Sequence, residues 1–138
     1  MKWKLLNGKE VNFVPAKYKI DWNRKVSKPQ KITKNFLFSF WKGHVVFEEM
    51  VLPKSGGKRF DIVNLSIKVI LEVSPDEVHL EFNQFMHGNR AGYLKKLKSD
   101  YEKMKIAELN GFKFIELNNR HLEDLSKEMF KREFDLDL

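Results

Sequence analysis

Two neighbouring apolar runs in this chain each carry an acidic residue at a position where a buried strand normally holds a hydrophobic one. Residues 59–63 contain Asp61 and residues 67–73 contain Glu72, and the turn-prone Asn-Leu-Ser between the runs predicts a β-hairpin. A carboxylate in a core strand is unfavourable unless it is paired or binds a metal. A connection over residues 65–68 would place Asp61 and Glu72 opposite each other on one face, whereas a shift of one residue would separate them. Two carboxylates at a sheet end predict a divalent-metal site.

Ion pairing is the alternative explanation for the same two acids. Asp61 could pair with Arg59 or with a lysine, and each such pair would satisfy the carboxylate without a metal. Glu72 could likewise pair with Lys68 or Lys113. The residues alone leave both arrangements open.

The length and composition of the chain exclude several classes of protein. With 138 residues, it can bury roughly two-thirds of its unfolded surface in one domain. It contains no cysteine, which excludes disulfide bonds and thiolate zinc sites. We find neither a signal-peptide pattern nor an apolar run near the ~18 residues that a membrane span needs. We therefore expect a soluble, cytoplasmic protein without membrane partners.

Positive charge is concentrated in the first quarter of the chain. Residues 1–34 contain ten Lys or Arg and two acids, a net charge of +8, whereas the remaining 16 basic and 17 acidic residues give −1. Four aromatic residues are interleaved with these cations, a mixture that suits contact with a nucleic-acid backbone and some base stacking. Residues 1–26 are thus predicted to form a basic N-terminal arm, and a merely solvated surface arm is the alternative.

The candidate DNA-binding residues come from this segment and from a loop that contains Gly56 and Gly57. They are Lys17, Lys19, Arg24, Lys25, Lys28, Lys54, Lys58 and Arg59. Contacts of this kind to phosphate position a nucleic acid without reading its sequence. The loop lacks the spacing of a P-loop, so binding of a nucleoside triphosphate is not expected.

The apolar spacings predict one α/β domain over residues 27–138, with a mixed central sheet flanked by helices. The expected elements are a helix over 27–43, strands over 45–52, 59–63 and 67–73, a helix over 91–109, a strand over 112–117 and a helix over 120–134. Ser27 as N-cap, with Gln30 three residues later, predicts a capping box. The predicted buried stripe of the long helix is Leu94, Leu97, Tyr101, Met104 and Ala107.

The segment between the hairpin and the long helix is rich in titratable residues. His79, Asn83 and His87 recur at a spacing of four, so one helical face could present all three. A two-histidine metal site is one interpretation of this pattern, and exposed loop histidines are the other.

The order helix, strand, strand with Asp61, strand with Glu72, helix and strand resembles the core of the PD-(D/E)XK nuclease superfamily. Within it, the chain is most similar to the very-short-patch-repair-like endonucleases and the related EDxHD homing endonucleases. The likeness includes the helix start at residues 27–30 and a histidine, His79, shortly after the strand glutamate. It covers roughly residues 27–117 of the chain.

The resemblance implies a restriction-endonuclease-like core and metal-dependent hydrolysis of phosphodiester bonds in double-stranded DNA. Asp61, Glu72 and the Val73 carbonyl would hold Mg²⁺ or Mn²⁺, ions that prefer oxygen ligands. Gln30 would orient the attacking water, and His79 would transfer a proton or act near the leaving oxygen. A homing-type or phage-borne site-specific enzyme of this size is expected to work as a homodimer or higher homo-oligomer.

Two positions depart from the family pattern. Ser74 stands where many members have Lys and where this branch commonly has Asp, and Gln30 stands where many relatives have Glu. The candidates for the missing charge are Asp76, His79, Lys103 and Lys105. One alternative to an active endonuclease is a catalytically inactive DNA-binding module of the same fold. The other is a small α/β interaction protein whose cationic arm binds an acidic protein.

Overall fold

The computed structural model describes residues 1–74 and 90–138, which form a mixed α/β fold around a four-stranded sheet. In the order in which they lie side by side, the strands are β3 (Val46–Val51), β4 (Arg59–Asn64), β5 (Val69–Val73) and β6 (Lys113–Leu117). The β3–β4 and β4–β5 pairs are antiparallel, whereas β5 and β6 are parallel. The parallel pair is possible because a helix lies between its strands in the chain. The predicted α/β class and mixed sheet are confirmed.

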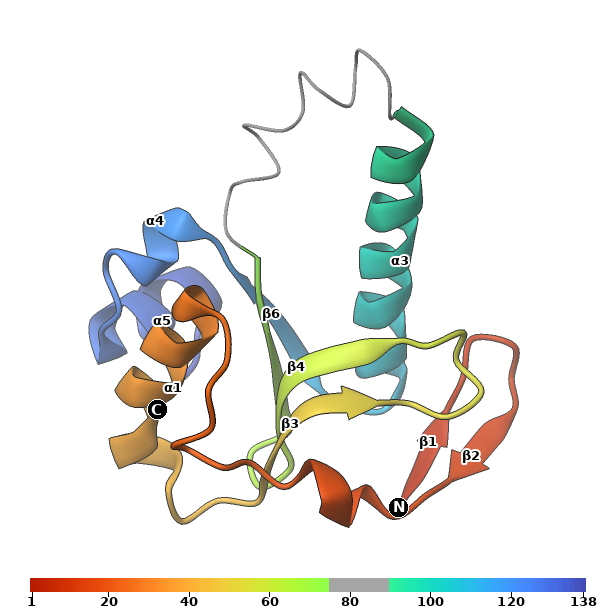
Figure 1. The fold of residues 1–138 in the computed structure, drawn as a ribbon, viewed down its shortest axis with the longest axis horizontal. Coiled ribbons are helices and arrows are strands. Elements are labelled where there is room, and N and C mark those ends of the chain that lie inside the picture. The colour runs from red at the N-terminus through yellow and green to blue at the C-terminus, as the bar shows by residue number, and fades with distance from the viewer. Residues whose placement is uncertain (75–89) are drawn as a thin grey trace.

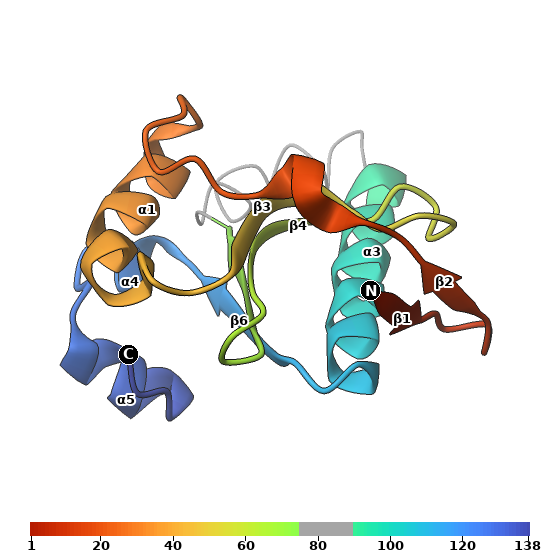
Figure 2. The same cartoon turned by 90° about the horizontal axis from the view of Figure 1, so that it is seen from below.

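Helices cover both faces of this sheet. The helices are α1 (Lys28–Trp41), α3 (Arg90–Leu109), α4 (Asn119–Leu122) and α5 (Lys127–Phe134). Helices α1, α4 and α5 lie on one side of the strands and α3 on the other (Figures 1 and 2). Two separate hydrophobic clusters follow from this layering, one that includes α1 and α5 residues and one that includes α3 residues.

The hairpin of β4 and β5 has the register that brings its two acids together. Asn64 pairs with Val69 and Ile62 pairs with Leu71, so the connection spans residues 65–68, which is the one of the two registers considered that joins the acids. Lys68 in this connection has a φ of 58°, a left-handed conformation that closes the tight turn. Continuing the register by one pair places Asp61 opposite Glu72.

Helix α1 begins at the predicted N-cap, but not by the predicted mechanism. Ser27 precedes the first helical residue and Pro29 lies in the first turn, yet the Ser27 side chain makes no capping hydrogen bond. The capping-box prediction was wrong, because Gln30 is buried instead of reaching back to the cap. Leu37 and Trp41 are fully buried, whereas Ile32 is 40% exposed.

The predicted buried stripe of the long helix was wrong over its first half. Leu94, Leu97 and Tyr101 are 51%, 46% and 56% exposed, and burial begins only at Ile106 and Ala107. The physical reason is visible in Figure 1, where the first turns of α3 extend beyond the strands and only its last turns lie against the sheet. Helical periodicity identifies an apolar face, but it does not show how far along the helix that face is covered.

The single closing helix predicted over residues 120–134 is two helices. Asn118 caps α4 by accepting a hydrogen bond from the His121 N–H, and Ser126 caps α5 by accepting one from the Met129 N–H. Each cap satisfies amides that the start of a helix leaves without partners, and therefore allows a new helix to begin. Met129 and Phe130 of α5 are buried in the core.

The N-terminal segment contributes directly to the core. It contains β1 (Lys2–Lys4), β2 (Glu10–Asn12) and the 3₁₀ helix η1 (Pro15–Tyr18). Trp3 is 2% exposed, and its ring lies 5.0 Å from that of Phe112 and 5.7 Å from that of Phe60. Part of the expected arm over residues 1–26 is therefore packed against the domain. Within the described residues, no helix is long and apolar enough to cross a membrane.

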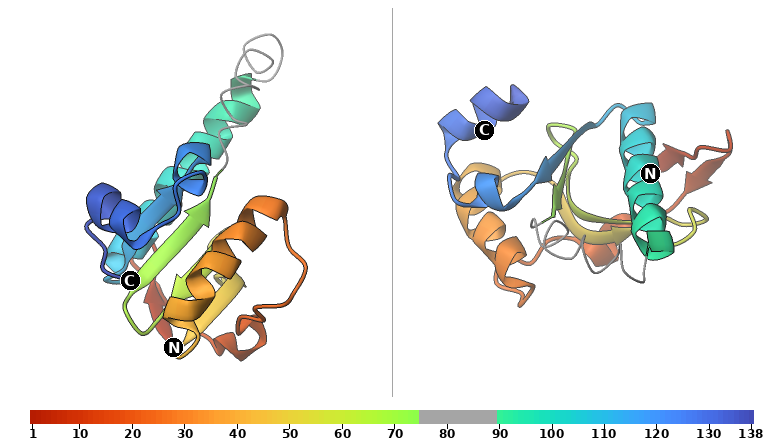
Figure 3. Two further views of the ribbon diagram at one scale, coloured as in Figure 1. Left: turned by 90° about the vertical axis from the view of Figure 1, so that its left-hand side faces the viewer. Right: turned by 90° about the horizontal axis from the view of Figure 1, so that it is seen from above.

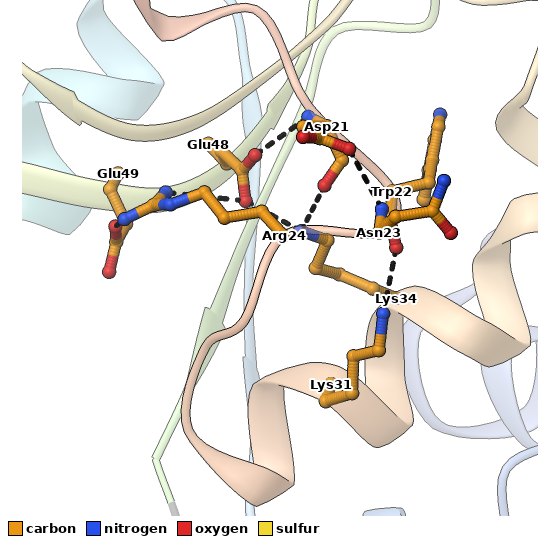
Figure 4. Close-up of polar contacts among 8 residues, drawn as sticks. All are labelled: Asp21, Trp22, Asn23, Arg24, Lys31, Lys34, Glu48 and Glu49. Carbon is orange, nitrogen blue, oxygen red and sulfur yellow. Dashed lines mark hydrogen bonds and ion pairs between the residues drawn. The ribbon is translucent and has the colours of Figure 1, made fainter.

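A buried ionic cluster attaches the end of this segment to α1 and β3 (Figure 4). Lys34 is fully buried, and its ammonium lies 2.7 Å from Glu48 Oε1 and donates a hydrogen bond of 2.6 Å to the Asp21 carbonyl. The Asp21 N–H donates to the other Glu48 oxygen at 2.7 Å. Arg24 adds ion pairs to Glu48 and to Glu49. Three segments of the chain thus share one set of charges.

We expect Lys34→Met to lower the free energy of unfolding by about 3–5 kcal/mol, because it leaves the Glu48 carboxylate buried without its cation. Urea denaturation measures this loss. Adding Glu48→Leu should restore part of the stability, since the unpaired charge is then removed. Lys25→Met replaces an exposed lysine and should change stability by no more than ~0.5 kcal/mol. A Lys34→Met protein as stable as that control would contradict this account.

Candidate active site

The carboxylates of Asp61 and Glu72 are held against each other's strands. Glu72 Oε2 accepts a hydrogen bond of 2.8 Å from the Asp61 N–H, and Asp61 Oδ2 accepts one of 3.0 Å from the Val73 N–H. This reciprocal pattern requires the register described above, because a shift of one residue would turn one acid to the opposite face. The two carboxylates predicted from sequence are therefore brought together at the end of the β4–β5 hairpin.

A lysine from α3 completes this group. The Lys103 ammonium lies 2.6 Å from Glu72 Oε1, and the two side chains are only 19% and 6% exposed. The lysines considered for Glu72 from sequence are engaged elsewhere: Lys68 lies over the Phe112 ring, and Lys113 donates to the Asp135 carbonyl. Glu72 therefore forms an ion pair, as one of the two interpretations held, but the predicted partners Lys68 and Lys113 were wrong. The partner is Lys103 of α3.

The pKa of Glu72 is raised to about 8. Burial of the carboxyl is the largest cause and the negative charge of Asp61 is the second, while the Lys103 ammonium acts in the opposite direction. Burial disfavours the charged form of an acid, and a second carboxylate adds repulsion. A strongly perturbed acid beside a second acid is typical of a functional site.

Glu116 is a neighbouring acid that the sequence analysis did not select. It pairs with Glu72 in the parallel β5–β6 register, so both side chains leave the same face of the sheet. Partial burial and the nearby Asp100 raise the pKa of the Glu116 carboxyl, whereas Lys96 and Lys103 oppose the shift. The alternation within residues 112–117 showed that Glu116 lies on one face of this strand. Nothing in the sequence indicated that Glu116 and Glu72 lie on the same face of the sheet.

Gln30 lies at the end of the molecule where these strands terminate. The N-terminal end of α1 and the C-terminal end of β5 lie at the same end of the sheet (Figures 1 and 3). The Gln30 side chain is 7% exposed, and its Nε2 has no hydrogen-bond partner among the residues that the structure describes. Within those residues, no hydrogen bond joins Gln30 to Asp61 or Glu72.

Other predicted site residues divide into described and undescribed ones. His79, and the proposed two-histidine site with His87, lie outside the described residues. Ser74 is described, and its N–H donates to the Leu117 carbonyl. Of the two described candidates for the missing charge, Lys103 contacts Glu72, whereas Lys105 pairs with Glu108 on the exposed side of α3.

The predicted DNA-binding residues are distributed over several surface elements. Arg24 is engaged with Glu48 and Glu49, and Lys58 is half-buried beside Glu102 at 3.8 Å. The remaining ones have exposed side chains: Lys17, Lys19, Lys25, Lys28, Lys54 and Arg59. Arg24 and Lys58 therefore have structural partners, and the exposed cations are the ones available to an anionic ligand.

The donor set at this site suits a hard divalent cation. Asp61 Oδ1 receives no hydrogen bond from any described residue, and carboxylate oxygens are the ligands that Mg²⁺ and Mn²⁺ prefer. A divalent cation would also relieve the repulsion between Asp61 and Glu72 that raises the Glu72 pKa. Within the described residues, no group of three or more His, Asp or Glu side chains is placed to hold a metal. The fit therefore rests on two carboxylates.

Comparison with protein-family models, with curated proteins and with solved structures found no match to this chain.

We expect the raised Glu72 pKa to make the protein less stable as the pH rises. The folded state keeps a proton that an unfolded glutamate releases near pH 4.5, so the stabilisation is complete below that pH and is lost as the pH approaches about 8. The free energy of unfolding should fall across this window in the wild type and fall less in Glu72→Gln. Denaturation at a series of pH values measures the difference, and identical slopes for the two proteins would contradict the assignment.

Proposed function

We propose that this chain is a metal-dependent endonuclease that hydrolyses phosphodiester bonds in double-stranded DNA. The observation that carries the proposal is the cluster of Asp61, Glu72 and Lys103, in which two carboxylates at a strand end meet one ammonium. Two carboxylates can hold a divalent metal, and an ammonium beside them can stabilise negative charge on a phosphate during hydrolysis. The mixed sheet, with the crossover helix α3 packed on its acid-bearing face, supports the same proposal.

Asp61 and Glu72 would hold Mg²⁺ or Mn²⁺, with the Val73 carbonyl as a further oxygen ligand. When bound, such an ion supplies a Lewis acid for the phosphate and lowers the pKa of a water molecule. The chain's own residues contribute orientation: the Val73 N–H fixes Asp61, and the Asp61 N–H fixes Glu72. The free amide of buried Gln30 is suited to orient a water molecule at the same end of the sheet.

Lys103 supplies the cation that position 74 lacks. Ser74 carries no charge, whereas the Lys103 ammonium is held beside Glu72 by a contact of 2.6 Å. From this place the ammonium can stabilise the negative charge that builds up on a phosphate during hydrolysis. The exposed cations at Lys25, Lys28 and Lys54 would contact the DNA backbone, and a homodimer would match a two-fold symmetric site.

A catalytically inactive DNA-binding module of the same fold is the second candidate. One observation favours it: both carboxylate oxygens of Glu72 already have partners, the Asp61 N–H and the Lys103 ammonium. In this case Lys103 would be a structural counter-ion, and binding would fall steeply with salt without any cleavage.

Incubation of supercoiled plasmid with wild-type protein and Mg²⁺ or Mn²⁺ should produce nicked or linear DNA, and chelator should prevent it. We expect Asp61→Asn, Glu72→Gln and Lys103→Met each to lower the cleavage rate by about 10²-fold or more, because each removes a charge at the reacting phosphate. Lys105→Met on the same helix is the matched control and should cut at nearly the wild-type rate. DNA binding without cleavage under either metal would favour the inactive module.

Binding of the metal can be measured without activity. At pH 8, millimolar Mg²⁺ should raise the melting temperature of the wild type, because the ion binds the folded carboxylate pair and relieves its repulsion. Asp61→Asn should abolish this rise. If Mg²⁺ stabilises wild type and variant equally, the ion binds elsewhere on the protein.

A further inference from the structure

A surface pocket lies between α1 and the loop that carries Trp22 and Asn23. It has a volume of about 220 Å³ and is lined by Trp22, Asn23, Asn35 and Phe38. The rings of Trp22 and Phe38 meet edge to face, with centroids 5.6 Å apart and an interplanar angle of 80°. Phe38 is 43% exposed, so its ring is accessible to a ligand.

The loop that carries Trp22 and Asn23 is fixed by the buried ionic cluster. Lys31 donates a hydrogen bond of 2.9 Å to the Trp22 carbonyl, and the Asn23 N–H donates one of 2.9 Å to Asp21 Oδ1. Figure 4 shows the Trp22 and Asn23 side chains on the side of the loop away from Glu48 and Glu49. The pocket therefore has one rigid wall from the loop and another from α1, so a ligand need not order it on binding.

The polar groups of the pocket are two side-chain amides. Neither the Asn23 nor the Asn35 amide has a hydrogen-bond partner among the described residues, and both side chains are exposed. An amide both donates and accepts, so it matches a group that presents a donor beside an acceptor. Flat heteroaromatic rings with such an edge stack on aromatic side chains and bond to amides, which is how unpaired bases are recognised.

The surroundings of the pocket favour an anionic ligand. Between residues 22 and 42 the chain contains six Lys or Arg and no Asp or Glu. Arg24 and Lys34 are engaged with Glu48, whereas Lys25, Lys28 and Lys42 have exposed side chains. Exposed cations in the same segment of the chain as exposed aromatic side chains are a combination that binds single strands through phosphates and bases together.

We propose that this pocket binds one unpaired base of a DNA strand. The base stacks on the exposed Phe38 ring and contacts Trp22, whose ring lies at 80° to that of Phe38. Its hydrogen-bonding edge meets the amides of Asn23 and Asn35, and the neighbouring phosphates lie along Lys25 and Lys28. The proposal rests on the proposed function only in taking DNA as the ligand. It adds a site that senses an unstacked base, separate from the carboxylates at the sheet end.

The fluorescence of Trp22 can report this binding without an added label. The chain has three tryptophans, and the other two, Trp3 and Trp41, are 2% and 0% exposed. A short single-stranded oligodeoxynucleotide should therefore quench the fluorescence of Trp22, because the bound base contacts its ring. An abasic oligomer with the same number of phosphates should leave the emission unchanged. Phe38→Ala should weaken the titrated affinity about 5- to 100-fold, the range expected for loss of one stacked base. Asn35→Ala should weaken it about 2- to 10-fold, the range expected for loss of one hydrogen bond.

Ser39→Ala, at an exposed position on the same helix, is the matched control and should bind as wild type does. Circular dichroism of each variant establishes that it is folded. Equal quenching by the abasic oligomer, or by an acidic peptide such as polyglutamate, would overturn the proposal, because the pocket would then sense charge alone. So would DNA binding that leaves Trp22 emission and both variants unaffected.

The plasmid assay separates this proposal from the endonuclease. If the protein cuts double-stranded DNA but its Trp22 fluorescence does not change with single-stranded DNA, it is an endonuclease without this base pocket. A protein whose Trp22 is quenched only by base-containing strands, and which never cuts with either metal, has the pocket without the endonuclease activity.

Discussion

The register between β4 and β5 is the constraint on which the candidate site depends. It makes the backbone N–H groups of Asp61 and Val73 the hydrogen-bond partners of two carboxylates. Side chains in a strand alternate between the two faces of the sheet. A shift of the register by one residue would therefore place one acid on the face covered by α1, where it would lack these donors. The tight connection over residues 65–68, with Lys68 in a left-handed conformation, fixes this register.

The ion pairs Lys34–Glu48 and Lys103–Glu72 have different roles in this fold. Lys34 and Glu48 lie within the layer of α1, and their partners fix the loop at residues 21–24 to the sheet. Lys103 and Glu72 lie on the opposite face, close to the strand ends, where the cation only partly offsets burial and the charge of Asp61. The first pair therefore holds structure together. The second leaves an acid with a pKa near the physiological range, which is useful for chemistry.

Each ion pair lies next to one of the two proposed contacts with DNA: Lys103–Glu72 is part of the carboxylate site, and Lys34–Glu48 holds the loop that lines the pocket. The carboxylates at the sheet end are suited to a metal and a phosphate, and the pocket on α1 is suited to a base. Helix α1 connects them, since its N-terminal end lies beside the strand ends (Figure 3) and its exposed face carries Asn35 and Phe38. A protein of this size would thus meet the backbone and a base of one nucleic acid through a single helix.

The sequence by itself determined most elements between residues 27 and 117, and it identified the pair of acids. Alternation identified the strands, because it depends on neighbours that are close in the chain, but it left open a shift of one residue in the β4–β5 register. Only the tertiary structure decided that Lys103 on α3 contacts Glu72 and that Glu116 lies beside Glu72. It also decided that the first turns of α3 extend past the sheet, which leaves Leu94 and Leu97 exposed. Those contacts join residues far apart in sequence, so only the packing of layers could specify them.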